Sequence, residues 1–318
     1  MRQFVSCSLK PPAMKNLSIP LVFVVFSAVI PLAYSQSMLQ PEWVLVKPSP
    51  LSNGNAEAWA IGTDSVENIF WGVNQDMPGL FQFMDAMLYK MDKDTQLIWT
   101  DTVFKDLYNQ QTYNLKATDS LVYLAGRSCR TLGTANCDAL FLEVSANASI
   151  PSGSPLASMV WDGGFGYEEI DGLAVEKEAV YLTGWTTGDG TNLDALLMKV
   201  DHSGNLIWQT SFGTGTPRED HQDGHIVVGD SLIFIAGLYD GSPGLGWDGQ
   251  ALLAKFDKNS GALADSLLFG RQDAWFNAEN ALGMASDGTN LFLTGISTTS
   301  PNNWDVFVTK FDKNFNQL

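Results

Sequence analysis

Short apolar segments that end in glycine recur along this chain at intervals of about 55 residues. Residues 68–72 read Asn-Ile-Phe-Trp-Gly, and similar segments return at 121–126, 180–184, 233–237 and 291–295. After a polar loop, each is followed by a second segment built on Asp-Ala-Leu-Leu-x-Lys-x-Asp, at 85–92, 138–145, 194–201, 250–257 and 305–312. A period made only of such segments and turns indicates a repeat architecture.

The repeating unit reads as four strands. In the last repeat, residues 279–286, 290–296 and 305–312 predict the first three, and Leu-Ile-Trp at 97–99 and 206–208 marks the fourth in other repeats. Several second strands are apolar on both faces, so both faces need cover. No stretch after the leader has a sustained helical period, and radially stacked four-stranded sheets supply that cover. We therefore predict an all-β fold, a β-propeller, with a β-sandwich as the alternative that the long period disfavours.

The positions of the strands predict how the propeller closes. The sequence ends just after a third strand, and residues 41–46, Pro-Glu-Trp-Val-Leu-Val, resemble the fourth strand that is due next. We predict a five-bladed β-propeller, a single domain over 41–318, closed by this N-terminal strand in the last blade. A fragment of a larger propeller is the alternative.

Residues 1–35 have the features of a signal peptide. Lys15 precedes an apolar run at 17–32, and Ala-Tyr-Ser at 33–35 forms a cleavage site. Met14 is an alternative start to Met1, and a transmembrane anchor is the alternative to a signal peptide. We expect cleavage near Ser35, with the mature protein secreted, periplasmic or at the cell surface and not inserted in a membrane.

The net charge of the chain restricts the kinds of partner that it can bind. The formal net charge of the 318 residues is −17, and the leader contains no acidic residue. Such an acidic surface repels phosphate backbones, so we exclude nucleic acid as a partner. We expect a monomer whose ligand is a protein or a glycan.

The sequence also resembles a known repeat family. Residues 194–208 read Asp-Ala-Leu-Leu-Met-Lys-Val-Asp-His-Ser-Gly-Asn-Leu-Ile-Trp, and residues 305–312 read Asp-Val-Phe-Val-Thr-Lys-Phe-Asp. Together with 290–295, these segments resemble the bacterial secreted β-propeller repeats abbreviated SBBP, over nearly all of 41–318. The resemblance implies secretion and a propeller, but no shared catalytic site. The chain departs from the pattern at Glu143 and Ser145, where Lys and Asp are usual, and at Asp265, which replaces a Trp.

Four acidic residues precede or open the predicted first strands: Glu57, Glu169, Asp223 and Glu279. First strands line the channel of a propeller, so these carboxylates could converge there. Converging carboxylates could bind calcium, or two could act as acid and base in glycoside hydrolysis. The alternative is that the acids recur because the repeat recurs, since repeat two has Gln110-Gln111 at this place.

Two further constellations carry possible chemistry. His221, Asp223 and His225 would share one face of an extended segment, a pattern that suits a transition metal but also occurs in polar loops. Cys129 and Cys137 are the only cysteines after the leader, and in an exported protein we expect a structural disulfide between them.

No cofactor is predicted. A sparse similarity to the tryptophan-docking repeats of quinone-dependent dehydrogenases, Asp201-x-x-Gly204-x-x-x-Trp208, does not imply a quinone. The loops after the second strands are expected to carry aromatic and acidic residues that suit sugar or peptide recognition, or that pack on their own blade: Trp185, Asp189, Tyr239, Asp240, Trp247 and Trp304.

The sequence thus favours a secreted, non-catalytic β-propeller that acts as a binding or scaffold module. The alternative is a carbohydrate-active hydrolase that uses two of the four acids named above.

Overall fold

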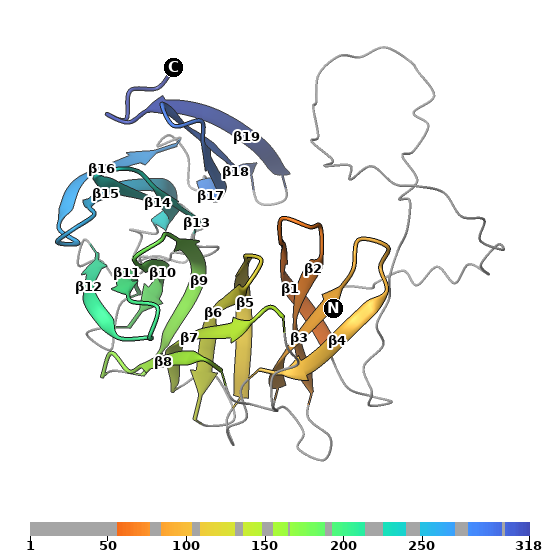
Figure 1. The fold of residues 1–318 in the computed structure, drawn as a ribbon. Coiled ribbons are helices and arrows are strands. Elements are labelled where there is room, and N and C mark those ends of the chain that lie inside the picture. The colour runs from red at the N-terminus through yellow and green to blue at the C-terminus, as the bar shows by residue number, and fades with distance from the viewer. Residues whose placement is uncertain are drawn as a thin grey trace, which may run out of the picture. The chain divides into compact units, whose positions relative to one another are not determined.

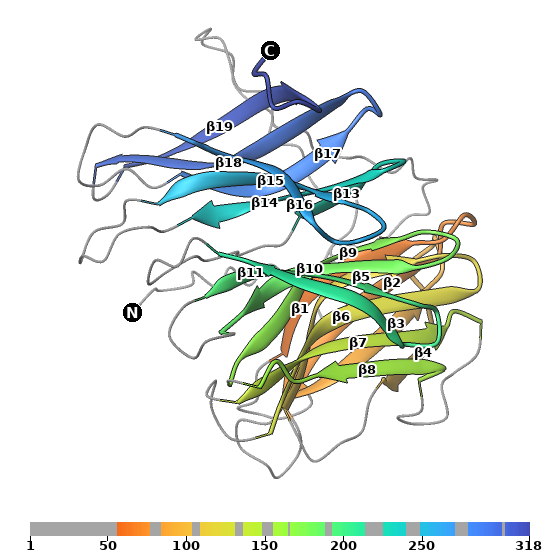
Figure 2. The ribbon, with the colours of Figure 1, turned by 90° about the vertical axis from the view of Figure 1, so that its left-hand side faces the viewer.

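The computed structural model describes residues 56–76, 84–103, 109–130, 136–147, 155–164, 166–187, 193–213, 225–239, 249–270, 279–300 and 303–318. Within these ranges the protein consists of nineteen β-strands and turns (Figures 1 and 2). The described part contains no helix that is long and apolar enough to span a membrane. The predicted leader at 1–35 and the predicted strand at 41–46 lie outside the described residues.

The strands form five antiparallel sheets, each made of strands consecutive in the sequence. The first contains β1 (Ala56–Thr63), β2 (Ile69–Asp76), β3 (Met84–Met91) and β4 (Leu97–Thr102). The second contains β5 (Asn109–Ala117), β6 (Leu121–Cys129), β7 (Cys137–Ser145) and β8 (Ala157–Trp161). The third contains β9 (Glu168–Val175), β10 (Val180–Thr186), β11 (Asp194–Val200) and β12 (Leu206–Phe212).

The fourth sheet contains β13 (His225–Val228), β14 (Leu232–Tyr239), β15 (Gln250–Asp257) and β16 (Leu263–Phe269). The fifth has three described strands, β17 (Glu279–Ser286), β18 (Asn290–Ser300) and β19 (Asn303–Asp312). The all-β fold and the repeating strand order are therefore confirmed. Trp185, Tyr239 and Trp304 lie within β10, β14 and β19 rather than in the loops where we placed them.

Consecutive sheets pack face to face, which explains the strands that are apolar on both sides. Leu124 of β6 lies in a core shared with the first sheet, whereas its neighbour Tyr123 lies in a core shared with the third. Leu182 and Tyr181 of β10 divide in the same way between the second and fourth sheets. The first strands also contact one another in sequence, β1 with β5, β5 with β9, β9 with β13 and β13 with β17.

The aspartate that ends the repeat motif is structural. The Oδ1 atoms of Asp92, Asp201 and Asp312 each accept hydrogen bonds from the backbone N–H groups two and four residues later. In repeat two, the Ser145 hydroxyl accepts a hydrogen bond from the Asn147 N–H instead. These side chains close the turn that follows the third strand, which is the usual role of Asp and Ser at such positions.

A β-bulge interrupts the first strand in four of the five sheets. The pairing with the second strand skips one residue in each case: Trp59, Tyr113, Asp171 and Leu282. The bulge brings the two backbones together beside the recurring glycine. A Cβ on Gly126 or Gly184 would overlap the carbonyl oxygen of Gln111 or Glu169, respectively. This close approach explains why glycine recurs in the second strand. The strands continue beyond the glycine, where the sequence led us to end them.

Candidate functional site

Strand register brings an arginine and a glutamate together where the second and third sheets meet. Arg127 of β6 pairs across the strands with Gln111 of β5, and Glu169 of β9 pairs with Trp185 of β10. The Nη1 atom of Arg127 lies 2.7 Å from Oε2 of Glu169, and both side chains are largely buried. The hydroxyl of Tyr167 donates to the same Oε2 at 2.7 Å. Glu169 is therefore held by two donors, one of them charged.

Arg127 is fixed by further contacts. Its Nε and Nη2 atoms donate to Oε1 of Gln111, the first at 2.8 Å. Its guanidinium lies 5.4 Å from the ring centre of Tyr113 and 5.3 Å from that of Tyr167, within the range of cation–π attraction. We call Gln111, Tyr113, Arg127, Tyr167 and Glu169 the Arg127 cluster.

Aromatic rings flank the Arg127 cluster on both sides. The rings of Tyr167 and Trp185 are stacked, with their centres 4.3 Å apart and their planes 5° from parallel. On the first sheet, Trp59 packs edge-on against Tyr113 at 5.9 Å. Tyr167 is buried and Trp185 half-buried, whereas Trp59 is 57% exposed, and an exposed aromatic face is suited to the apolar face of a sugar ring.

Carboxylates from the first and third sheets affect the pKa of the Tyr113 hydroxyl. Burial raises the pKa of Tyr113, and the negative charge of Glu169 raises it further. Arg127 opposes this shift, whereas Asp171 and Glu57 add smaller upward contributions. The hydroxyl donates to Oε1 of Gln111 at 2.6 Å. Glu57, Glu169 and Asp171 therefore all lie close enough to the half-buried phenol of Tyr113 to affect its pKa.

The bulges create this arrangement. Trp59, Tyr113 and Asp171 are the residues skipped in the pairing of β1, β5 and β9. A bulge re-aims the side chain of the skipped residue away from the regular alternation. The amide of Asn114, next to Tyr113, donates to the carbonyl oxygen of Asp171 at 2.9 Å and joins two of the bulges.

The predicted acids have different outcomes. Glu57 lies on β1 and accepts a hydrogen bond from the indole N–H of Trp59 at 3.0 Å, and Glu169 joins the Arg127 cluster. Glu279 begins β17 as predicted, and Asp223 lies outside the described residues. Gln111, which we took as a gap in the series of acids, is instead the acceptor shared by Arg127 and Tyr113.

The predicted transition-metal set stays a prediction. His225 begins β13 and pairs with Ala236 of β14. His221 and Asp223 lie outside the described residues, as do Asp189, Asp240 and Trp247.

The predicted disulfide between Cys129 and Cys137 is confirmed. It joins the end of β6 to the start of β7, two residues after Arg127. The Cys137 N–H also donates to the carbonyl oxygen of Gly166, so the disulfide loop is tied to the segment that leads into β9.

Sequence reasoning missed Arg127, Tyr113 and Tyr167. One signal was available for Arg127, because the residue after the recurring glycine is apolar in every other repeat: Val73, Trp185, Leu238 and Ile296. Arg127 is the one charged residue in that series. Tyr113 gave no comparable signal, because its direction depends on the bulge.

Comparison with known proteins gives no family. No family model matches the chain, and no curated protein matches it. Solved structures with a similar arrangement include Bacillus subtilis levansucrase, at 10% identity and a TM-score of 0.43, covering 81% of this chain and 84% of that one. An exo-1,5-α-L-arabinanase from a bovine ruminal metagenomic library has 11% identity and a TM-score of 0.40, covering 81% and 94%. The polysaccharide lyase Uly1 has 10% identity and a TM-score of 0.48, covering 79% and 56%.

These comparisons correct one expectation. We predicted a non-catalytic binding or scaffold module, whereas the three similar structures are carbohydrate-active enzymes by name. The non-catalytic interpretation is therefore set aside. Identities near 10% relate no individual residue of this chain to a residue of those enzymes.

Proposed function

We propose that this protein is a carbohydrate-active hydrolase whose catalytic site contains the Arg127 cluster and Glu57. One observation carries the proposal. The carboxylate of Glu169 lies between the Arg127 guanidinium and the Tyr167 hydroxyl, beside stacked aromatic rings, and Glu57 of the first sheet acts on the same Tyr113 phenol. Such a site offers a fixed anion, a second carboxyl and ring faces for a sugar.

Glycoside hydrolysis needs two carboxyl groups with different protonation states. Arg127 and Tyr167 both donate to Glu169, which stabilises its anionic form. Glu169 is therefore the base or nucleophile in this proposal. Glu57 is exposed on the first sheet, and in this proposal it is the acid that protonates the leaving oxygen.

The aromatic residues position the substrate in this scheme. Trp185, stacked on the buried ring of Tyr167, is half-buried next to Glu169, and Trp59 is an exposed ring next to Glu57. A sugar ring held between them would lie between the two carboxyl groups. Such positioning by aromatic faces is common where a ligand has apolar faces and polar edges.

The test is a screen of aryl glycosides and polysaccharides with the wild-type protein and three variants. We expect Glu169→Gln to lower kcat by roughly 10²- to 10⁴-fold and Glu57→Gln to lower it most for poor leaving groups. Glu178→Gln is the matched control, because the Glu178 side chain is 82% exposed and, among the described residues, forms an ion pair with its neighbour Lys177 alone. Melting temperatures of all variants show whether they are folded.

Two results would refute the proposal. One is a folded wild-type protein that turns over no substrate in the set. The other is a Glu169→Gln variant that retains the wild-type rate.

We further infer that the five sheets are the blades of a five-bladed propeller and that residues 41–46 add a fourth strand to the last one. The fifth sheet has three described strands where the others have four. Trp304, Val306 and Val308, alternate residues of β19, are exposed, Val306 by 80%. On the first sheet, Trp59 and Ile61 of β1 are exposed as well. Apolar faces at both ends of the series of sheets support closure, because contiguous exposed apolar patches are costly.

Hydrogen exchange tests the closure. We expect the amides of β19 to exchange much faster in a protein that starts at residue 49 than in one that starts at residue 36, because the added strand would protect one edge. Equal exchange rates in the two proteins would contradict the closure by residues 41–46.

A further inference from the structure

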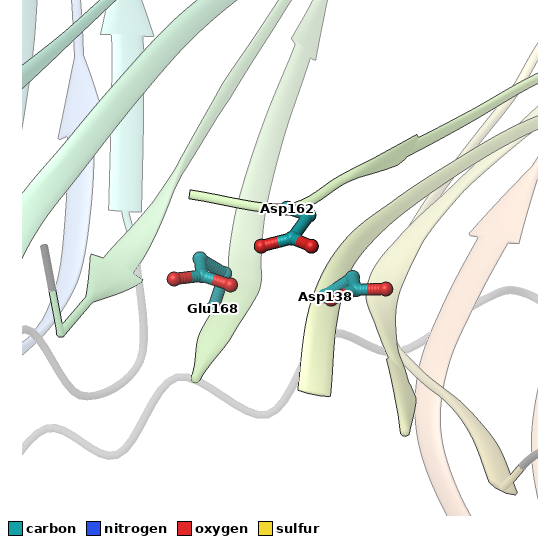
Figure 3. Close-up of side chains that lie close together, drawn as sticks. All are labelled: Asp138, Asp162 and Glu168. Atoms are coloured by element: carbon teal, nitrogen blue, oxygen red, sulfur yellow. The ribbon is translucent and has the colours of Figure 1, made fainter. Parts of the chain in front are cut away.

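Three carboxylates meet on the far side of β9 from Glu169. Asp138 is the second residue of β7, Asp162 follows β8, and Glu168 begins β9. One carboxylate oxygen from each lies within 4.8 Å of the others. Figure 3 shows the three side chains directed toward one another from the second and third sheets. We call these residues the acidic triad.

Two members of the acidic triad are buried and incompletely satisfied. Glu168 is 0% exposed and the Asp138 side chain is 2% exposed. Oε2 of Glu168 and Oδ1 of Asp138 are both buried, and neither has a hydrogen-bond partner among the described residues. An anionic oxygen without a partner costs several kcal/mol in a protein interior, so a positive group is expected at this point.

The other atoms of the acidic triad hold it in place. Oε1 of Glu168 accepts a hydrogen bond from the Thr186 hydroxyl at 3.2 Å, and the Gly163 N–H also donates to Glu168. Oδ1 of Asp162 accepts from the Gly164 N–H at 2.7 Å. These bonds fix the carboxylates in a shared orientation without neutralising them.

Arg130 neutralises only part of the charge. Its Nη2 atom lies 2.8 Å from Oδ2 of Asp138 and 3.4 Å from Oδ2 of Asp162, and its side chain is 45% exposed. One guanidinium against three carboxylates leaves a charge of −2 when all three are ionised. Burial raises the pKa of Glu168 and also that of Asp138, where Arg130 opposes the shift. The site therefore takes up either protons or a divalent cation.

We propose that Asp138, Asp162 and Glu168 bind a divalent cation and that the cation class is calcium. The ligand set consists only of carboxylate oxygens. Hard cations prefer such ligands, whereas transition metals are usually bound through imidazole nitrogen or cysteine sulfur. The remaining charge of −2 matches one such ion. Calcium accepts irregular sets of oxygen ligands at flexible geometry and fills the other positions with water, whereas magnesium demands a near-ideal octahedron.

A cation here would join two sheets beside the disulfide. Asp138 follows Cys137 directly, and Glu168 lies between Tyr167 and Glu169. The ion would therefore fix the start of β9, on whose opposite face Tyr167 and Glu169 contact Arg127. The proposal rests on the acidic triad alone and is independent of the reaction that the Arg127 cluster carries out.

The test is calorimetric titration of calcium into the chelated full-length protein, together with melting curves in calcium and in EDTA. Calcium at 100 times its dissociation constant should raise the melting temperature by roughly 5 °C. Glu168→Gln and Asp138→Asn should abolish both the binding heat and the shift. Glu178→Gln, which changes the same charge at an exposed position, should retain both. Magnesium in place of calcium should give a smaller shift.

A second measurement separates a cation from bound protons. A carboxyl group whose pKa is higher in the folded than in the unfolded protein stabilises the fold when the pH is below its unfolded pKa. That contribution is lost as the pH rises through the folded pKa. In EDTA, the melting temperature of the wild-type protein should therefore fall with rising pH more than that of Glu168→Gln. Calcium should restore it in the wild type alone.

A melting temperature that calcium leaves unchanged at every pH would refute the proposal, as would an equal shift in Glu168→Gln. Neither result depends on turnover. A protein that binds calcium but cleaves no glycoside would refute only the proposed function.

Discussion

Gly184 is the position where a single methyl group should damage the fold most. A Cβ at Gly184 would lie 2.7 Å from the carbonyl carbon of Glu169 and 2.8 Å from Cα of Ile170, and it would overlap the Glu169 carbonyl oxygen. All three atoms belong to the backbone, so no side-chain rotation can relieve the contact. Gly184→Ala must therefore push β9 away from β10 at the bulge.

The size of the effect follows from the displacement. Ordinary van der Waals contact begins near 3.4 Å, so the carbonyl carbon must move by at least 0.7 Å and the oxygen by more. Such a shift breaks two or three backbone hydrogen bonds, each with a net contribution of about 1 kcal/mol. It also displaces Glu169 from Arg127. We expect Gly184→Ala to lower the free energy of unfolding by roughly 3–5 kcal/mol.

Gly72 provides the matched control. It is the recurring glycine of β2, as Gly184 is that of β10, but a Cβ there would lie 3.3 Å from Cβ of Ala60 and from Oγ1 of Thr112, and both neighbours are side-chain atoms. We expect Gly72→Ala to change the free energy of unfolding by less than about 1 kcal/mol. Urea denaturation followed by tryptophan fluorescence measures both variants. Equal losses at the two positions would show that the close approach of backbones at the bulge does not determine the need for glycine.

Four further predictions test other parts of the structure. Thr95→Gly should raise the melting temperature, with a gain of about 1 kcal/mol, because Thr95 has a φ of 64° where the equivalent turn after β11 has Gly204; a lower melting temperature would contradict this reasoning. Reduction of the Cys129–Cys137 disulfide should cost about 2.5 kcal/mol on the chain-entropy model, measured by denaturation with and without reductant, and an unchanged midpoint would show that the loop is held by other contacts. Arg127→Leu should destabilise the protein by about 2–3 kcal/mol because it leaves Glu169 without its cation, and Glu169→Gln in the same chain should recover part of this loss in denaturant titrations; no recovery would mean that the two residues are not coupled. Hydrogen bonds from Asn290 and Thr289 lower the pKa of Asp287 to about 2, so the stability that Asp287 adds is present above pH 4 and is lost as the pH falls toward 2; Asp287→Ser should therefore melt below the wild type at pH 7 and together with it near pH 2, and a constant gap would contradict the assignment.

The strands could be predicted from the sequence because burial on both faces leaves a strong signal. The predicted strand at 279–286 has the bounds of β17, and the predicted strand at 305–312 lies within β19. A strand covered by two sheets must be apolar at nearly every position. Only a few residue types, such as Asp and Gly, suit the turns between strands. Local rules of this kind can be recognised in a single repeat.

The candidate site could be predicted only in part. Glu57 and Glu169 were found because acids recur before the first strands. Tyr113 was not found, because it is skipped in the strand pairing. A skipped residue does not follow the regular alternation of faces from which side-chain directions are predicted. The acidic triad was missed for another reason. Asp138 occupies the place of Asp85, Asp194 and Asp305 in the motif, so nothing in its own repeat distinguishes it. Its partners come from the next strand and the next sheet.

The structural role of the motif lysine shows how a departure from the repeat can be recognised. Lys90 Nζ donates to the carbonyl oxygen of Ala146 in the next sheet at 2.8 Å, and Lys255 Nζ approaches that of Lys313 at 3.4 Å. Repeat two has Glu143 at this place, and its carboxylate contacts Nδ1 of His202 in the next sheet at 3.3 Å. The substitution keeps the link between sheets and changes its chemistry.

Three departures from the repeat lie between the second and third sheets. Arg127 replaces an apolar residue there, the Cys129–Cys137 disulfide has no counterpart in the other repeats, and Glu143 replaces a lysine. In a repeat protein, equivalent residues pack at every interface between neighbouring sheets, so the same residue types are expected at each interface. Catalysis and ion binding need one asymmetric site instead. Charge, a disulfide and bulged side chains are concentrated at one junction of equivalent sheets, and both the proposed catalytic site and the proposed cation site lie there for this reason.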